Sequence, residues 1–328
     1  LQIGVSAKTL NTVYGKKFIP RIECMLGRNI DDLSKSGISW PCIVTEKLDG
    51  VRRILIKENG ICRFYSRSGH EDTGLIEIIE DAKHLPDNRV YDGELLAAGN
   101  FQDSIAQRQA TNSIGNSKGN KTGLVYHVFD MLDLHDFWAD SMLKEALYRK
   151  IILGATFMDK SIRFLCNEWP QLISYYGIGK KLTFIKPVPI LGLVYSIDEV
   201  VPIVESIWDK GGEGVMLNTS TGLYKKSRSK ELIKVKNVKE YVLKVVDIVE
   251  GTGKFKDMLG SLVVDYKGNK VGVGSGFTDE ERTMIWANPS KYIGREVEID
   301  SFGESTSMTG SVSLNCPTFK RFVKEHRS

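Results

Sequence analysis

The chain has 328 residues, of which 41% are hydrophobic and 26% charged, so it is long enough for two domains with hydrophobic cores. No apolar run reaches the length of a membrane span, and the N-terminus lacks the basic-then-apolar order of a secretory signal. The formal net charge of +4 suits a nucleic-acid partner but does not prove one.

The cysteines and histidines give no sign of a disulfide framework or of a zinc site. The five cysteines form no Cys-x-x-Cys pair and cannot all pair with one another, and the five histidines lack metal-ligand spacing. We therefore expect a reducing, intracellular location, the cytoplasm, or the host cytoplasm if the protein is viral. The sequence begins at Leu1, from which we expect that an initiating methionine is missing.

The segment Thr45–Arg53 places Lys47 beside an acid, a glycine and an arginine, directly after the apolar run Ile43–Val44. Lysine is a nucleophile only when neutral, and an ordinary pKa of about 10.4 leaves about one amine in a few thousand neutral at pH 7. Nearby cations or burial favour the neutral form. The alternative interpretation is a strand end followed by an Asp49–Gly50 turn, with a solvated lysine.

Four further clusters follow in the sequence, and each taken alone reads as an ordinary strand with a solvated face. Together with Lys47 they supply two carboxylates, an aromatic plate and two more cations, which are the parts of a nucleoside triphosphate site. The clusters are Val90–Leu96, Val125–Leu132, Gly212–Leu217 and Leu232–Lys236.

Helical patterns at Ser141–Ile152 and Ile197–Lys210 lie among these strands, as expected for an α+β domain. The polar stretch Gly99–Gly123 is interpreted as a DNA-contacting loop or a solvent-exposed excursion. Gly251–Lys256 is a better DNA-facing candidate, because it offers backbone amides and two lysines to phosphates.

The last part of the chain has short β-like runs separated by turns, and one helix-like segment at Thr278–Ala287. This spacing predicts a small barrel or sandwich. The runs are Tyr241–Val249, Ser261–Tyr266, Lys270–Val273 and Glu296–Ile299.

Six short motifs occur in a fixed order: Lys47–Arg52, Ser66–Gly69, Asp92–Glu94, Phe129–Asp130, Glu213–Val215 and Lys234–Lys236. They resemble the ordered motifs of the covalent nucleotidyltransferases, and most closely those of the small, bacteriophage-type ATP-dependent DNA ligases. The resemblance runs from about Glu46 to the C-terminus. It implies an α+β nucleotidyltransferase (adenylation) domain over residues 1–238, followed by a small all-β OB-fold domain over residues 239–328.

The resemblance implies three phosphoryl transfers with ATP and Mg²⁺ or another divalent cation. Lys47 would attack the α-phosphate of ATP, release pyrophosphate and carry AMP. The AMP would pass to a 5′-phosphate at a nick, and the 3′-hydroxyl would then displace it and seal the strand. Such transfers depend mainly on positioning and charge neutralisation.

The lysine pair and one glutamate have roles that fit these transfers. Lys234 and Lys236 would share one face of a strand, where they can neutralise the α-phosphate and favour the nucleophilic form of Lys47. Glu213, in a Gly-Gly-Glu-Gly setting, is the candidate Mg²⁺ ligand, directly or through water. The alternative for the lysine pair is a basic strand face.

The remaining candidate residues would hold the nucleotide. By resemblance, Glu94 accepts hydrogen bonds from the ribose hydroxyls; the alternative is a simple acid near a turn. Phe129 stacks on adenine unless it is an ordinary core residue. Arg52 and Arg67 have planar forks suited to phosphate or ribose. Glu46, directly before the nucleophile, is grouped with them.

Three other charged residues of the motifs have no predicted contact with the nucleotide. Arg53 is expected on the surface, whereas Asp49 and Asp130 are expected to act through turns or supporting hydrogen bonds.

The pattern departs from the family near the C-terminus. Ligases of this type usually carry an arginine where Asn315 aligns, and that motif orients the β- and γ-phosphates during lysine adenylylation. Lys320 or Arg321 would have to substitute. If neither does, self-adenylylation should be slow.

The favoured interpretation is a monomer that clamps nicked double-stranded DNA between its domains, mostly through sequence-independent phosphate contacts. The alternatives are an RNA ligase, an RNA-capping guanylyltransferase, or a non-catalytic nucleic-acid-binding relative. The run Phe129–Leu134 and the C-terminal pattern resemble DNA ligases more. The intact lysines and glutamates argue against loss of catalysis.

Overall fold

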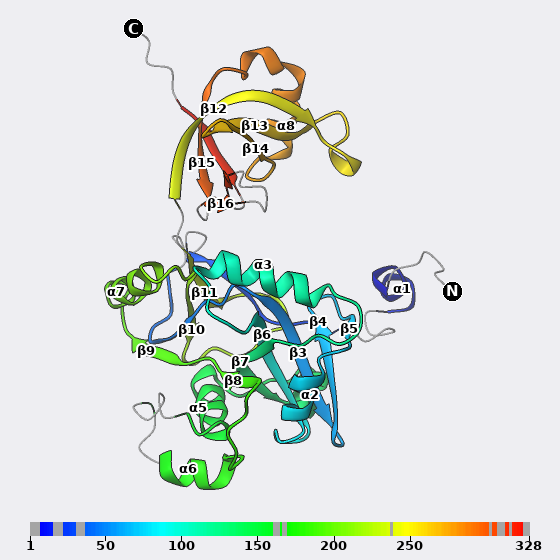
Figure 1. Cartoon of the computed structure of the whole chain (residues 1–328), viewed down its shortest axis with the longest axis vertical. Coiled ribbons are helices and arrows are strands. Elements are labelled where there is room, and N and C mark those ends of the chain that lie inside the picture. The colour runs from blue at the N-terminus through cyan, green and yellow to red at the C-terminus, as the bar shows by residue number, and fades with distance from the viewer. Residues whose placement is uncertain are drawn as a thin grey trace. The chain divides into compact units, whose positions relative to one another are not determined.

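The computed structural model describes residues 7–15, 22–30, 37–159, 165, 169–236, 239–301, 304–306, 312–314 and 317–323. The chain divides into two compact units, Leu1–Val235 and Lys236–Ser328, each with its own hydrophobic core (Figure 1). Among the described helices, none is long and apolar enough to cross a membrane.

Six described strands of the first unit form one mixed sheet. In spatial order they are β5 (Glu71–Asp72), β4 (Ile61–Ser66), β3 (Val51–Glu58), β6 (Arg89–Ala97), β7 (Leu124–Asp133) and β8 (Ile185–Pro187). Neighbours are antiparallel except for the parallel pair β7 and β8. The β3–β4 hairpin turns at Asn59 and Gly60, whose φ angles are 50° and 76°. An Asn-Gly pair with positive φ is typical of such a tight turn.

Five more described strands of the first unit form a second sheet. In spatial order they are β1 (Leu26–Asn29), β11 (Arg228–Lys236), β10 (Gly214–Thr219), β2 (Cys42–Glu46) and β9 (Ile190–Val194). β2 runs antiparallel to both β10 and β9. Val44, Val215 and Ile233 are fully buried and pack in one cluster with Val200 and Val204 of helix α7 (Ile197–Trp208). This packing fixes the strands that carry three of the six motifs.

The other helices of the first unit are α1 (Ala7–Tyr14), α2 (Ile76–Ala82), α3 (Ser104–Gly115), α4 (Leu134–Ala139), α5 (Ala146–Thr156) and α6 (Trp169–Tyr176). Helices α2 and α5 contribute buried side chains to the core of the six-stranded sheet. In that core, the rings of Phe64 and Tyr126 meet edge to face, with centroids 5.1 Å apart.

The second unit is all-β apart from helix α8 (Asp279–Ala287) and two short 3-10 turns in its described residues. An isolated parallel bridge links Ser275, shortly after one edge strand of its five-stranded sheet, with Thr318 in the other edge strand, so the sheet closes into a barrel. In spatial order the strands are β14 (Asn269–Val273), β13 (Leu259–Tyr266), β12 (Lys239–Glu250), β15 (Glu296–Ser301) and β18 (Thr318–Phe322), with a separate pair β16 (Glu304–Thr306) and β17 (Val312–Leu314).

Most of the elements expected from the sequence are present, including the four strand runs of the second unit and its helix. Thr278 caps that helix, because its side chain accepts from the Glu281 N–H and the Glu281 side chain accepts from the Thr278 N–H. The helix expected at Ser141–Ile152 begins later, at Ala146. Glu145 is still extended there and bridges to Leu223, which explains the later start.

Gly99–Gly123 is not simply a loop, because its centre is helix α3. The Asp103 carboxylate caps this helix by accepting from the Ala106 N–H at 2.8 Å. Thr111 is fully buried, and its hydroxyl accepts from the Ala97 N–H at 2.8 Å. A tertiary contact of this kind stabilises a helix whose sequence has little apolar periodicity.

Gly50 stands where the start of β3 approaches β6 most closely. A Cβ atom at this position would lie 2.1 Å from the Leu95 carbonyl oxygen and 2.7 Å from a methyl carbon of Leu96. The first of these atoms belongs to a paired strand, so it cannot move away at low cost. Only glycine fits here.

We expect Gly50→Ala to lower the free energy of unfolding by about 2 kcal/mol or more, because the clash is with backbone. Gly115→Ala is the matched control, since its Cβ would meet no atom within 4 Å. Thermal unfolding of both variants checks this. Equal melting temperatures would contradict the close approach seen at Gly50.

Candidate active site

Lys47 directly follows β2, beside the start of β10. Its N–H donates to the Gly214 carbonyl oxygen at 2.9 Å, and Glu46 pairs with Val215 in the strand register. The Lys47 Nζ forms an ion pair with the Glu213 carboxylate. The two side chains are 17% and 10% exposed, so both remain reachable from solvent. The pairing of β2 with β10 therefore brings the expected nucleophile and the expected metal ligand together.

Glu46 is half-buried and lies by the turn that precedes Glu213. One of its carboxylate oxygens would be 3.4 Å from a Cβ added at Gly212. Burial raises the pKa of Glu46, and the Lys210 ammonium partly opposes this rise. Glu46 therefore contacts the same turn that positions Glu213.

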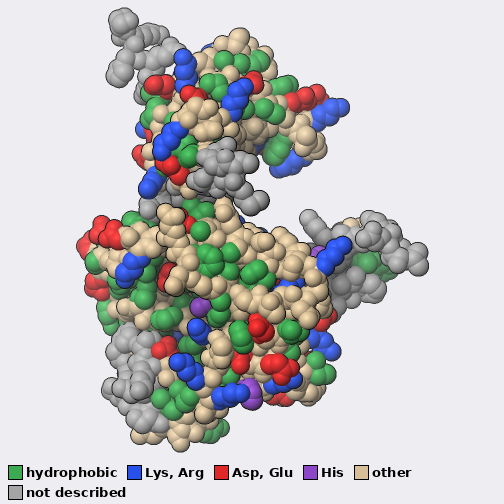
Figure 2. Space-filling view, viewed as in Figure 1, with side chains coloured by type: hydrophobic (Ala, Val, Ile, Leu, Met, Phe, Trp, Pro, Cys, Tyr) green, Lys and Arg blue, Asp and Glu red, His purple; other side chains and the backbone are tan. Residues whose placement is uncertain are grey.

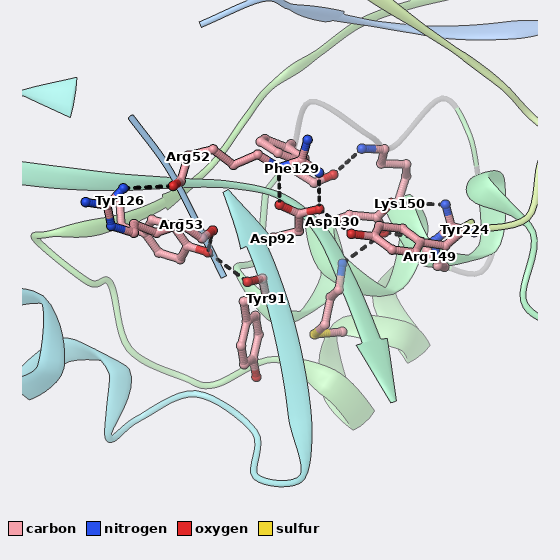
Figure 3. Close-up of polar contacts among 11 residues, drawn as sticks. Arg52, Arg53, Tyr91, Asp92, Tyr126, Phe129, Asp130, Arg149, Lys150 and Tyr224 are labelled. Carbon is pink, nitrogen blue, oxygen red and sulfur yellow. Dashed lines mark hydrogen bonds and ion pairs between the residues drawn. The ribbon is translucent and has the colours of Figure 1, made fainter. Parts of the chain in front are cut away.

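Arg52 is held by two partners on neighbouring elements (Figure 3). Its Nε donates to Asp92 Oδ1 at 2.8 Å, and a terminal nitrogen donates to the other oxygen of the same carboxylate. Asp92 is fully buried and also accepts from the Tyr224 hydroxyl at 2.6 Å. The Arg52 guanidinium carbon lies 5.2 Å from the centre of the Phe129 ring, within range of a cation–π contact.

Phe129 is partly exposed on β7, and a second cation, Lys150, lies near it. The Lys150 ammonium donates to the Phe129 carbonyl oxygen and lies 5.9 Å from the ring centre (Figure 3). Burial lowers the pKa of Lys150, with Asp130 opposing the shift. Phe129 is thus held at its backbone carbonyl, and two cations lie near its ring.

Asp130 forms a buried ion pair that anchors helix α5 to β7. Arg149 donates to the two Asp130 oxygens at 2.8 and 3.0 Å. Burial raises the pKa of Asp130, but Arg149 and Lys150 outweigh it and leave that pKa below its ordinary value. A buried carboxylate held at two points by one guanidinium is strongly oriented.

Sequence reasoning missed Arg149, Lys150 and Tyr224. Adjacent cations in a helix are usually assigned to solvent. Here the side chains of both cations are buried, because each finds an oxygen partner in β7. Their position after a predicted aromatic–acid strand is the only signal in the sequence, and it is weak.

Glu94 lies on β6, opposite Arg52 on one side and His127 on the other. Burial raises the pKa of Glu94 to about 7, although Arg52 and Lys47 lower it. The influence of Lys47 shows that the expected ribose acceptor and the nucleophile share one electrostatic neighbourhood. Burial also lowers the pKa of His127 to about 4, so this imidazole is neutral at pH 7.

The glycine of the Asp92-Gly93-Glu94 motif has a packing reason. A Cβ atom at Gly93 would lie 2.5 Å from the His127 carbonyl oxygen and 2.7 Å from the Tyr126 ring. The Tyr126 hydroxyl lies 2.8 Å from the Tyr91 carbonyl oxygen (Figure 3). The absence of a side chain at position 93 lets this buried ring pass beneath the motif.

Arg67 is exposed in the turn after β4. Its charge acts on the buried Cys24 thiol, as do the charges of Arg52, Asp92 and Glu94, which places these groups in one neighbourhood. Burial raises the pKa of Cys24 to about 11.

The lysine pair lies on β11, next to β10 in the five-stranded sheet. Ile233 and Val235 are buried, whereas Lys234 and Lys236 between and after them are half-buried. The alternation puts both lysines on one face of the strand. Adjacent strands therefore carry Lys47, Glu213 and the lysine pair.

The described residues offer few protein ligands for a divalent cation. Among the described residues, no group of three or more histidines, cysteines or acids could hold a metal. Mg²⁺ usually keeps several waters and binds through one or two carboxylates and substrate phosphates. Glu213 fits such a site as a single carboxylate.

Arg53 is not on the surface as expected. Its side chain is 13% exposed, and its Nε donates to Asp72 at 2.6 Å. Lys121 forms an ion pair with the same carboxylate. The two-stranded pairing of β4 with β5 brings Asp72 beside β3, a long-range contact that the sequence does not reveal.

The two cations considered as substitutes near the C-terminus are engaged within the second unit. The Lys320 ammonium pairs with Glu240 and lies 3.3 Å from Asp300, and Arg321 pairs with Glu298 at 2.8 Å. Asn315 lies outside the described residues, so its effect on adenylylation stays a prediction.

Comparisons with known proteins agree with this geometry. Residues 25–236 match the family model described as the ATP dependent DNA ligase domain, and residues 250–322 match that of the DNA ligase OB-like domain. The first match alone spans more than half of the chain. The chain belongs to the ATP-dependent DNA ligase family.

The similarity to two phage DNA ligases covers nearly all of this chain. The DNA ligases of Enterobacteria phages T4 and T6 are 26% and 25% identical to it over 371 aligned residues, covering 97% of this chain and 71% of each relative. The solved structure "Pmar-Lig_PreS3" is 28% identical with a TM-score of 0.74, covering 97% of this chain and 72% of that one. A structure from a study of Lig E DNA ligases, 22% identical with a TM-score of 0.65 over 92% of this chain and 99% of that one, shares the fold.

These findings confirm the predicted fold class, an adenylation domain followed by an OB-fold domain, and the predicted enzyme class. They do not favour an RNA ligase or a capping guanylyltransferase.

The raised pKa of Glu94 predicts a pH dependence of stability. The folded ligase keeps a proton on Glu94 up to a pH of about 7, whereas the unfolded chain releases it near its ordinary pKa of 4.5. The contribution of this group to stability therefore falls as the pH rises from about 4.5 to 7. Glu94→Gln cannot ionise, so it does not lose stability in this way as the pH rises. The difference in melting temperature, variant minus wild type, should therefore be larger at pH 8 than at pH 5.

Thermal unfolding at both pH values measures this difference. Glu58→Gln, at the exposed end of β3, is the control and should show no such change with pH. An equal difference for Glu94→Gln at both pH values would contradict the raised pKa.

Proposed function

We propose that this ligase seals 5′-phosphate/3′-hydroxyl nicks in duplex DNA through an AMP carried on Lys47 and a DNA-adenylate intermediate. The observation that supports it best is the Lys47–Glu213 ion pair at the junction of β2 and β10. It places one reactive amine beside one carboxylate, at the edge of a strand that neighbours the lysine pair. A phosphoryl-transfer site needs these groups in one place.

The nucleotide would lie over Phe129, with its ring against adenine and Glu94 accepting from the ribose hydroxyls. Phe129 is partly exposed, and its backbone is tied down by Lys150, so a base can stack on it without moving it. The Asp92 carboxylate occupies two nitrogens of Arg52. Arg52 would therefore contribute a fixed positive charge and support the Phe129 ring. It would not bind a phosphate through the two nitrogens that Asp92 occupies.

The phosphates would face Lys234 and Lys236, with Arg67 as an exposed cation at the mouth of the site. Two lysines on one strand face can neutralise charge that develops on the α-phosphate. Glu46 would hold the turn before Glu213 in place. The domains proposed for these tasks are residues 1–238 for the nucleotide chemistry and 239–328 for DNA.

Glu213 would be the Mg²⁺ ligand, and the metal, when bound, would polarise the phosphate oxygens as a Lewis acid. The same carboxylate pairs with Lys47 in the ligand-free arrangement. For Lys47 to attack, its amine must leave this ion pair and lose a proton. Glu213 would therefore hold Lys47 in place before reaction and release it when the nucleotide binds.

The DNA partner would be nicked duplex bound by a monomer through phosphate contacts, in the cytoplasm. The small positive net charge of the chain is consistent with this. In the second unit, Lys254 lies over the Phe255 ring at 4.3 Å, in the stretch Gly251–Lys256 that faces solvent. This stretch offers an ammonium and exposed backbone amides to a phosphate.

We expect Lys47→Ala to abolish covalent labelling by α-labelled ATP, because it removes the proposed nucleophile. The wild type should form an acid-labile adduct that nicked DNA discharges with sealing of the nick. Labelling with GTP and NAD⁺ in parallel tests the choice of nucleotide. An adduct retained in Lys47→Ala would assign the nucleophile elsewhere, and salt-sensitive DNA binding without any adduct would favour a non-catalytic relative.

We expect Glu213→Gln to raise the Mg²⁺ concentration needed for half-maximal adenylylation about tenfold or more, because it removes the only carboxylate charge proposed for the metal. Glu205→Gln, on the exposed face of α7, is the control. Adenylylation rates across a Mg²⁺ titration measure the shift. An unchanged midpoint would remove Glu213 from the metal site.

A further inference from the structure

Helix α3 contacts both loops that meet at the Lys47–Glu213 ion pair. We call Lys47–Gly50 the nucleophile loop and Gly211–Glu213 the acid loop. The two loops come from different parts of the chain, and α3 lies across β3 and β6 beside them (Figure 1). Helix α3 has no role in the function proposed above.

Side chains of the helix bind backbone groups at the end of β6, as a neighbouring strand would. The Thr111 hydroxyl accepts from the Ala97 N–H at 2.8 Å, and Gln107 donates to the Ala97 carbonyl oxygen at 3.0 Å. Ala110 and Ile114 pack on the core of the six-stranded sheet. These contacts fix α3 to the sheet, and they are separate from its contacts with the two loops.

The N-terminus of α3 contacts the acid loop. The Ser104 N–H donates to the Gly211 carbonyl oxygen at 3.1 Å. Gly211 has a φ of +78°, and a Cβ added there would lie 3.2 Å from the Asp103 Cβ. The helix start thus packs closely against the turn that ends at Glu213.

One turn further along, α3 contacts the nucleophile loop. Arg108 donates to Asp49 at 3.0 Å, across 59 positions of sequence. The Asp49 side chain is 9% exposed and that of Arg108 45%. A largely buried carboxylate requires a compensating charge or hydrogen bonds, and Arg108 supplies a charge from the solvent side.

The geometry points to α3 as a brace that sets the position of Lys47 relative to Glu213, with Arg108 as a positioning residue for lysine adenylylation. This inference rests on the proposed function of Lys47. Arg108 does not touch the reacting atoms; it holds Asp49, two residues after the nucleophile. Small errors in the placement of a nucleophile are costly to rate, because reacting atoms must approach within about 3–3.5 Å.

The surface over α3 offers a competing role for Arg108. Figure 2 shows that this surface consists mostly of uncharged polar side chains and backbone. Such a surface could contact DNA phosphates, and Arg108 could then serve DNA binding alone. The two roles differ in the reaction step that they affect, because lysine adenylylation occurs without DNA.

Two variants remove the two contacts without breaking the helix. Arg108→Gln removes the positive charge that pairs with the Asp49 carboxylate. Ser104→Pro removes the N–H that bonds Gly211, and proline is tolerated at this first helical position. Asp103 before it is already extended, as a residue preceding proline prefers. Arg63→Gln, on an exposed position of β4, is the matched control.

The test is single-turnover adenylylation with α-labelled ATP and Mg²⁺, without DNA, over a range of ATP concentrations. We expect each variant to lower the maximal rate about threefold to tenfold, with the ATP concentration for half-maximal rate unchanged. Arg108→Lys should restore part of the rate, and Arg63→Gln should match the wild type. Melting temperatures establish that the variants are folded, and Arg108→Gln suffices if Ser104→Pro unfolds.

Folded Arg108→Gln that adenylylates at the wild-type rate would overturn the brace. If that variant instead binds nicked DNA more weakly with a reduced salt dependence, Arg108 is a phosphate contact. Equal losses of adenylylation rate in Arg108→Gln and Arg108→Lys, with lower melting temperatures, would show that Arg108 serves only folding. That result would also overturn the brace. A wild type that takes no label would refute the proposed function itself, before any variant is compared.

Discussion

The pairing of β2 with β10 is the constraint on which the site depends. Through one backbone bond, from the Lys47 N–H to the Gly214 carbonyl, it fixes two side chains that are 166 positions apart in the sequence. The sheet order then adds the lysine pair from β11, the next strand. Apolar packing on α7 holds these strands in register, so the chemistry of the site rests on an ordinary hydrophobic core.

Two buried ion pairs support the residues proposed to bind the nucleotide. Asp92 and Asp130 are buried, and each is held by a guanidinium at two points, from Arg52 and Arg149. Buried ion pairs contribute little net stability, but they fix orientation well, because every alternative arrangement leaves a charge unpaired. In this ligase that orientation is applied to the Phe129 ring and to the strand that carries Glu94.

The sequence was enough to propose roles for residues in short motifs that resemble those of the family, and it missed residues whose contacts depend on the fold. Lys47, Glu94 and Phe129 lie in short strand motifs, so their identity and order were enough to propose roles. Helix α3 was missed because contacts to β6 stabilise it, and those contacts do not appear as apolar periodicity in Gly99–Gly123. Arg53 and Arg149 were missed because cations are assigned to solvent unless a partner is known, and their partners come from other elements.

Burial of the thiols has a consequence for the chemical durability of the ligase. Burial raises the pKa values of Cys24 and Cys42 to about 11, so both thiols are protonated at pH 7. Oxidants and alkylating agents react with the thiolate and need access to it. Cys24 can therefore lie near Arg52 and Glu94 while being protected from both kinds of damage. The surroundings of Arg52 and Glu94 should therefore be unchanged by oxidants that would modify an exposed thiol.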